Sequence, residues 1–146
     1  MSYWPYLLAI AVGAGLTLQV GMNGAVGTGI GSPLLASIVN FVVGLAALVA
    51  VAVVGGARIA PGSPGTVPGW AWLGGLFGAA YVAAITVLGP RLGAVALLAL
   101  VLLGQMAAAL LVDHFGIVGF EQTAVTPARL IGVALLGAGV MLIIRN

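Results

Sequence analysis

Residues 93–112 read GAVALLALVLLGQMAAALLV, a run that carries no charge and a single amide, Gln105. An α-helix rises about 1.5 Å per residue, so a bilayer hydrocarbon core of about 30 Å requires roughly 20 apolar residues. Backbone groups find no water partner in lipid and must bond within the segment, which favours a helix. The stretch therefore predicts a transmembrane helix, and the rest of the chain can be compared with it.

Four more runs of similar character complete the chain. We expect them to span the membrane at residues 4–21, 33–54, 70–88 and 128–144, with 93–112 as the fourth of five. The composition agrees, with 63% hydrophobic and 4% charged residues. Six charged side chains cannot cover a soluble domain of 146 residues, and the alternating segments of a membrane β-barrel are absent. The sequence predicts an all-α integral membrane protein forming one five-helix domain, residues 1–146.

The connections between these runs hold most of the helix-breaking residues. We expect turns at Asn23–Pro33, Gly55–Gly69, Gly89–Arg91 and Asp113–Pro127. The short third connection would make the third and fourth spans an antiparallel hairpin.

The four arginines divide evenly between the two sides that five spans define. Arg58 and Arg129 share the side of the N-terminus, and Arg91 and Arg145 lie on the other. Orientation follows the Lys/Arg bias of short loops, so an even count predicts that both orientations insert. Two oppositely inserted copies would then form an antiparallel homodimer. The alternative is a single orientation, set by one arginine that outweighs the others by its position.

Several function classes lack the residues they need. There is no cysteine, one histidine and two acidic residues, which leaves no catalytic triad, metal cluster or phosphate-binding loop. We therefore expect no enzyme activity, no metal and no cofactor. A net charge of +2 without a basic patch also argues against a nucleic-acid partner.

The polar residues inside the spans are the candidates for function, because an intramembrane polar group needs a partner or a watery cavity. The predicted substrate-binding residues are Gln105, Tyr81, Asn40, Gln19 and Asn23. For any one amide the alternative is a hydrogen bond between helices, worth about 1 kcal/mol. As a set drawn from four spans, these residues favour a shared polar cavity.

Asp113 and His114 end the fourth span and are the candidates for proton coupling, since a carboxylate or imidazole in the pathway serves that purpose. A carboxylate at a helix C-terminus opposes the helix dipole, which favours a specific role. The alternative for Asp113 is a structural pairing with Arg129 or Arg58.

Several motifs together resemble a known family. They are Gln19-x3-Asn23, Gly31-Ser32-Pro33, Asn40-Phe41-Val42-Val43-Gly44, Trp72-Leu73-Gly74-Gly75-Leu76-Phe77-Gly78, Pro90-Arg91-Leu92-Gly93, Gly104-Gln105 and Asp113-His114-Phe115-Gly116. The series is similar to the YdcZ-type bacterial inner-membrane proteins of the drug/metabolite transporter superfamily. Asn40 departs from the family pattern, in which a small hydroxyl residue is expected.

The resemblance implies a five-helix unit that occurs as dual-topology homodimers, paired genes or fused inverted repeats, related to the small multidrug resistance exporters. It names no ligand. With the polar residues, it favours a secondary transporter of a small neutral, zwitterionic or weakly cationic metabolite, working by alternating access in an antiparallel homodimer. The alternatives are a dual-topology ion channel and a non-transporting membrane subunit. The expected partners are the lipid bilayer, a second copy of the chain and a small-molecule substrate.

Overall fold

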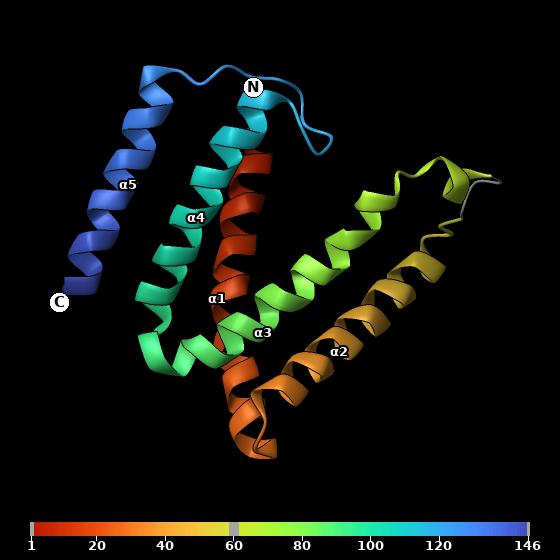
Figure 1. Ribbon diagram of the computed structural model, residues 1–146. Helices are drawn as coiled ribbons and strands as arrows, with labels where there is room; N and C mark the ends of the chain where they lie inside the picture. Colours follow the sequence, from red (N-terminus) through yellow and green to blue (C-terminus); the bar gives the residue numbers. More distant parts are fainter. Residues whose placement is uncertain (1, 59–61, 146) are drawn as a thin grey trace. The chain divides into compact units, whose positions relative to one another are not determined.

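The computed structural model of the chain describes residues 2–58 and 62–145. Its elements, in order, are α1 (Trp4–Ile30), α2 (Pro33–Val54), the 3-10 turns η1 (Ser63–Thr66) and η2 (Gly69–Leu73), α3 (Gly74–Leu92), α4 (Ala94–Phe115) and α5 (Pro127–Arg145) (Figure 1). No strand occurs among these residues. Five helical segments are long and apolar enough to cross a membrane, which confirms the five predicted spans.

Two predicted turns are wrong, because the helices continue through them. Residues 23–30 belong to α1, and the turn is only Gly31 and Ser32. Gly31 ends the helix with a φ of +75°, and Ser32 caps α2 by accepting a hydrogen bond from the Leu35 amide at 3.3 Å. The glycines of α1 cost little when neighbouring helices support the backbone, so they did not mark a helix end.

The expected turn at Gly89–Arg91 is likewise helical. Pro90 lies inside α3, and the chain turns at Gly93, which has a φ of +75°. A proline removes one i→i−4 hydrogen bond, here the bond to the Thr86 carbonyl, but it does not have to end a membrane helix. The second span agrees with its prediction of 33–54, whereas the fourth extends to Phe115.

The chain divides into two compact units, Met1–Arg91 and Leu92–Asn146, which we describe separately. The single-domain organisation stays a prediction. In the first unit α1 packs antiparallel against α2, where a Cβ at Gly27 would lie 3.4 Å from the Pro33 Cα and 3.6 Å from the Ala36 Cβ. Helix α3 runs alongside α2 in the opposite direction (Figure 1), and a Cβ at Gly78 would lie 3.9 Å from the Phe41 Cζ. In the second unit α4 packs against α5.

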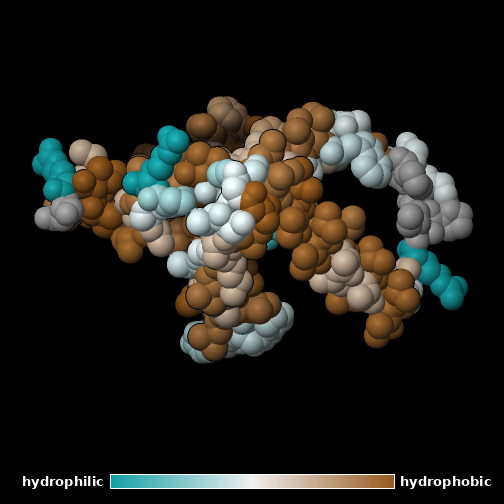
Figure 2. All heavy atoms as spheres, turned by 90° about the horizontal axis from the view of Figure 1, so that it is seen from below, coloured by the Kyte–Doolittle hydropathy of each residue, from teal (hydrophilic) through white to brown (hydrophobic). Residues whose placement is uncertain are grey.

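The outer surface of these helices is apolar. Figure 2 shows mostly hydrophobic residues on the helices, with hydrophilic residues in a few small groups. Most of the large apolar side chains are exposed, including Trp70 and Trp72 in η2. An apolar surface of this extent suits contact with lipid and with other membrane helices.

Candidate functional site

A cavity of about 460 Å³ lies in the first unit between α1, α2 and α3. Its two polar lining residues are Gln19 of α1 and Asn40 of α2, and both are half-buried. The Gln19 Nε2 donates a hydrogen bond to the Asn40 Oδ1 at 3.0 Å. The rest of the lining is apolar, from Phe41 on α2 to Val82 on α3. The fold thus brings together two predicted site residues that are 21 positions apart in sequence.

Asn23 lies one turn beyond Gln19 on α1 and is 5% exposed. It belongs to a buried stripe with Val20 and Gly27. Its Nδ2 is a buried side-chain atom without a hydrogen-bond partner among the described residues. Such a donor costs about 1–3 kcal/mol in lost hydration. Asn23 does not line the 460 Å³ cavity.

A pair of hydroxyls extends the polar interior of this unit. Ser37 of α2 and Thr86 of α3 are both buried, and their side-chain oxygens are 3.4 Å apart. Each also donates to its own helix, Ser37 to the Pro33 carbonyl at 3.0 Å and Thr86 to the Val82 carbonyl at 2.7 Å. Thr86 was missing from the residues that the sequence singled out. Its only signal was a hydroxyl within an apolar run.

Thr86 also lines a second cavity in the first unit, of about 230 Å³, with Gly27, Thr28 and Pro33. This cavity and the larger one lie at successive levels of the same three helices. On α1 the larger cavity is lined by Gln19 and the smaller one by Gly24, Gly27 and Thr28, so Asn23 lies between the two sets in sequence.

Tyr81 is half-buried on α3 and precedes Val82, but it does not line the 460 Å³ cavity. Gln105 belongs to the second unit, near the middle of α4, and is exposed. In the described part of the chain neither side chain makes a hydrogen bond. The structure therefore joins Gln19 to Asn40, whereas Asn23 and Tyr81 do not line the cavity of this pair.

The second unit holds an ion pair at one end. The Arg129 Nη1 of α5 lies 3.1 Å from the Asp113 Oδ2 of α4, with the two side chains 41% and 32% exposed. This is one of the two pairings that the sequence left open for Asp113. The loop after α4 supports it, because the Thr123 amide donates to the Asp113 carbonyl at 2.7 Å.

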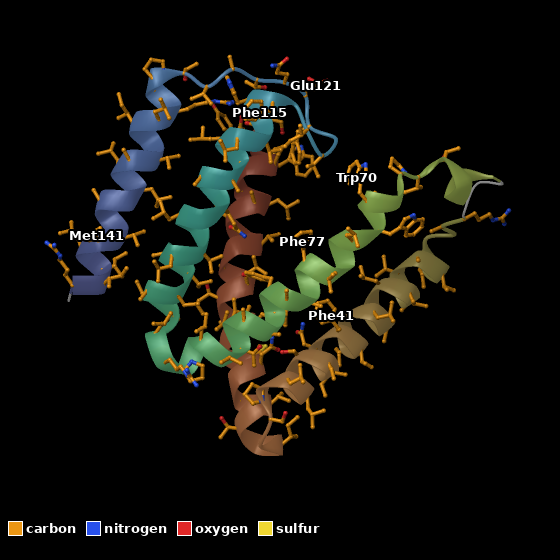
Figure 3. All side chains as sticks on the ribbon, in the orientation of Figure 1. Phe41, Trp70, Phe77, Phe115, Glu121 and Met141 are labelled. Carbon is orange, nitrogen blue, oxygen red and sulfur yellow. The ribbon has the colours of Figure 1, made fainter. Side chains whose placement is uncertain are left out.

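His114 is exposed, and its ring lies edge-on to Phe115 with a centroid distance of 4.9 Å. Its carbonyl accepts a hydrogen bond from the Gln122 side chain at 3.0 Å. Phe115 lies at the end of α4, close to the loop that carries Glu121 (Figure 3). Within residues 2–58 and 62–145, no cluster of three or more metal-binding side chains is present.

The family of the chain follows from its similarity to a known protein family. Residues 4–142 match the family described as "Putative inner membrane exporter, YdcZ". The chain belongs to the YdcZ family. The protein is thus a multi-pass inner membrane protein of an exporter family, which confirms the resemblance noted in the sequence. Comparisons with curated proteins and with solved structures give no significant match.

Proposed function

We propose that this YdcZ protein is a secondary transporter that exports a small neutral, zwitterionic or weakly cationic metabolite by alternating access. The observation that carries the proposal is the amide pair at the 460 Å³ cavity. The bond from Gln19 to Asn40 leaves the Gln19 Oε1 and the Asn40 Nδ2 for a ligand. If both amides were flipped, one carbonyl and one amino group would still remain. A ligand with both a donor and an acceptor fits this pair.

The cavity also limits the charge of its ligand. No charged side chain lines it, and its other walls are apolar. An anion or a multiply charged cation would lose its hydration there without gaining a counter-charge, which is costly in a medium of low dielectric constant. A neutral solute avoids that cost. In a zwitterion the two opposite charges partly offset each other, and a weak cation can lose its charge by releasing a proton.

Three further residues keep their proposed substrate-binding role, each on its own observation. Asn23 offers a buried donor without a partner, one turn from Gln19. Tyr81 is half-buried beside Val82, which lines the cavity. Gln105 is an exposed amide near the middle of α4, where lipid alone cannot satisfy it.

We propose that two copies insert in opposite orientations and form the working transporter. Two arginines on each side give no orientation bias, and inverted repeats around a midplane site are a recurrent basis of alternating access. Asp113 and His114 remain the proposed proton-coupling residues. A proton arriving at Asp113 would compete with Arg129 for the same carboxylate, which would link protonation to the α4–α5 contact.

The test is export from liposomes that contain the purified protein. The vesicles are loaded with a sugar alcohol, a zwitterionic amino acid, a primary monoamine and a dicarboxylate, and released solutes are measured by mass spectrometry. We expect release of at least one of the first three solutes and none of the dicarboxylate. Replacing Gln19 by Leu should reduce that release about tenfold, because it removes ligand hydrogen bonds and leaves Asn40 unpaired.

Thr17→Val is the matched control. Thr17 is an exposed polar residue on α1, and its hydroxyl bonds to the Gly13 carbonyl of its own helix. Its replacement should leave release unchanged. Parallel recordings on a solid-supported membrane separate the rival functions. Brief currents that depend on solute support a transporter, and sustained ion currents would establish a channel instead. No release of any solute would favour the membrane-subunit alternative.

A further inference from the structure

An apolar groove in the second unit ends at the ion pair of Asp113 and Arg129. It has a volume of about 420 Å³ and lies between α4 and α5. Its α4 wall consists of Leu102, Met106 and Ala109, with Leu110 beside them. These positions recur at helical spacing, so they form one continuous stripe that leads to Asp113. The ion pair closes one end of the groove, and its other end is wholly apolar.

The α5 wall lacks a side chain near the charged end of the groove. It is formed by Gly132, Val133 and Leu136, which follow Arg129 along one face of the helix. A Cβ at Gly132 would meet nothing within 4 Å, so the missing side chain is part of the hollow.

The length of the groove matches one leaflet of a bilayer. Asp113 and Arg129 each lie two residues from the end of a helix that is long enough to span a membrane. We therefore expect both side chains at the depth of the lipid headgroups. From Asp113 to Leu102 the α4 wall covers a rise of roughly 16 Å, and half of the hydrocarbon core is about 15 Å. A groove that runs from the headgroup level to the midplane has the reach of one lipid acyl chain. This holds for either orientation of the protein.

The ion pair at the end of the groove determines which lipid headgroups fit there. Only the Asp113 Oδ2 and the Arg129 Nη1 are used in the ion pair, which leaves the second carboxylate oxygen and further guanidinium donors accessible. The two side chains present both signs of charge side by side. A purely anionic headgroup would face Asp113, and a purely cationic one would face Arg129. A zwitterionic headgroup, with a phosphate and an ammonium group, complements both.

We propose that this groove is a binding site for phosphatidylethanolamine. One acyl chain fills the hollow between α4 and α5, the phosphate accepts hydrogen bonds from Arg129, and the primary ammonium donates to Asp113. Phosphatidylcholine has the same net charge, but its quaternary ammonium has no N–H donor. The site is therefore selective for the ethanolamine lipid. The proposal does not depend on the transport function.

The experiment is native mass spectrometry of the purified protein in detergent, titrated with dioleoyl phosphatidylethanolamine and, in parallel, with dioleoyl phosphatidylcholine. We expect the ethanolamine lipid to bind about threefold to fivefold more tightly, the range that partly exposed charge contacts provide. Replacing Gly132 by Leu fills the groove and should weaken binding of both lipids at least fivefold. Gly139→Leu is the control, since Gly139 lies two turns further along α5, has the same open surroundings and does not line the groove.

Two further experiments distinguish the contribution of the headgroup to binding from that of the acyl chain. The double variant Asp113→Asn with Arg129→Gln should still bind lipid but lose the preference for phosphatidylethanolamine. Soluble glycerophosphoethanolamine should not displace the lipid at millimolar concentration. Equal binding by Gly132→Leu and the unmodified protein would overturn the site. Equal affinity for the two lipids would overturn the headgroup assignment. Full displacement by the soluble headgroup would show that the ion pair binds a water-soluble zwitterion instead.

Discussion

At the scale of single residues, we expect the buried amide of Asn23 to lower the stability of the fold. A purely structural role does not explain such a residue. It is 5% exposed and its Nδ2 has no partner among the described residues. Replacing Asn23 by Leu, which has the same number of side-chain heavy atoms, should stabilise the protein by about 1–3 kcal/mol because it removes the unsatisfied donor. If Asn23 binds substrate, the same variant should also lose export. The measurements are the thermal unfolding midpoint in detergent and the liposome export assay.

Met22→Leu is the control for this prediction, because Met22 neighbours Asn23 but is exposed. We expect neither its unfolding midpoint nor its export to change. A lower unfolding midpoint for Asn23→Leu would contradict the argument and would mean that the amide has a stabilising partner, such as an ordered water.

The Asp113–Arg129 pair gives a second prediction at this scale. Both side chains are more than 30% exposed, so the pair should add at most about 1 kcal/mol to stability. Asp113→Asn should therefore leave the unfolding midpoint nearly unchanged. If Asp113 couples protons, this variant should lose solute export driven by a pH gradient and retain exchange of solute at equal pH. Loss of both activities would argue against a specific coupling role.

At the scale of the elements, the turn after α4 requires glycine at position 116 for two reasons, its backbone conformation and the lack of space for a side chain. Gly116 caps α4 with a φ of +59°, and a Cβ there would lie 2.9 Å from the Gln122 Cβ and 3.1 Å from the Gln122 Cα. Gly116→Ala should cost more than the roughly 1–2 kcal/mol of a left-handed alanine, because backbone atoms must also move. The loop held by the bond from Thr123 to Asp113 would shift with them.

Gly119 separates these two effects. Its φ of +84° also lies in the range that L side chains rarely adopt, but a Cβ there would meet nothing within 4 Å. Gly119→Ala should therefore pay only the conformational cost. Unfolding of both variants in detergent, measured by circular dichroism, tests the difference. Equal losses of stability would show that the contact with Gln122 relaxes freely.

Also at the scale of the elements, some helix ends and the contacts between helices could not be predicted from the sequence. Apolar runs identified all five spans because bilayer thickness fixes their length. The ends of α1 and α3 could not be read from glycine and proline, because helix packing supports both inside a membrane helix, as at Pro90. The polar residues Gln19 and Asn40 were recognisable individually. Their direct hydrogen bond depends on the register between α1 and α2, which no local pattern records.

At the scale of the whole molecule, the arginine distribution makes its own prediction about insertion. The sequence contains no cysteine, so Gly65→Cys, in the connection between α2 and α3, gives a single thiol. An impermeant thiol reagent added outside intact cells should label about half of the molecules, because two arginines on each side leave no bias. Labelling after membrane disruption supplies the total.

Two single-charge variants extend this test, because each leaves more arginines on one side of the membrane than on the other. Arg145→Gln leaves Arg58 and Arg129 against Arg91, so the connection with Arg58 should be cytoplasmic and outside labelling of Gly65→Cys should fall. Arg58→Gln leaves the opposite excess and should raise that labelling above half. An antiparallel dimer needs both orientations, so both variants should reduce export, and coexpressing them should restore it. Complete or absent labelling of the unmodified charge pattern would contradict dual insertion and would require a partner subunit for any inverted pair.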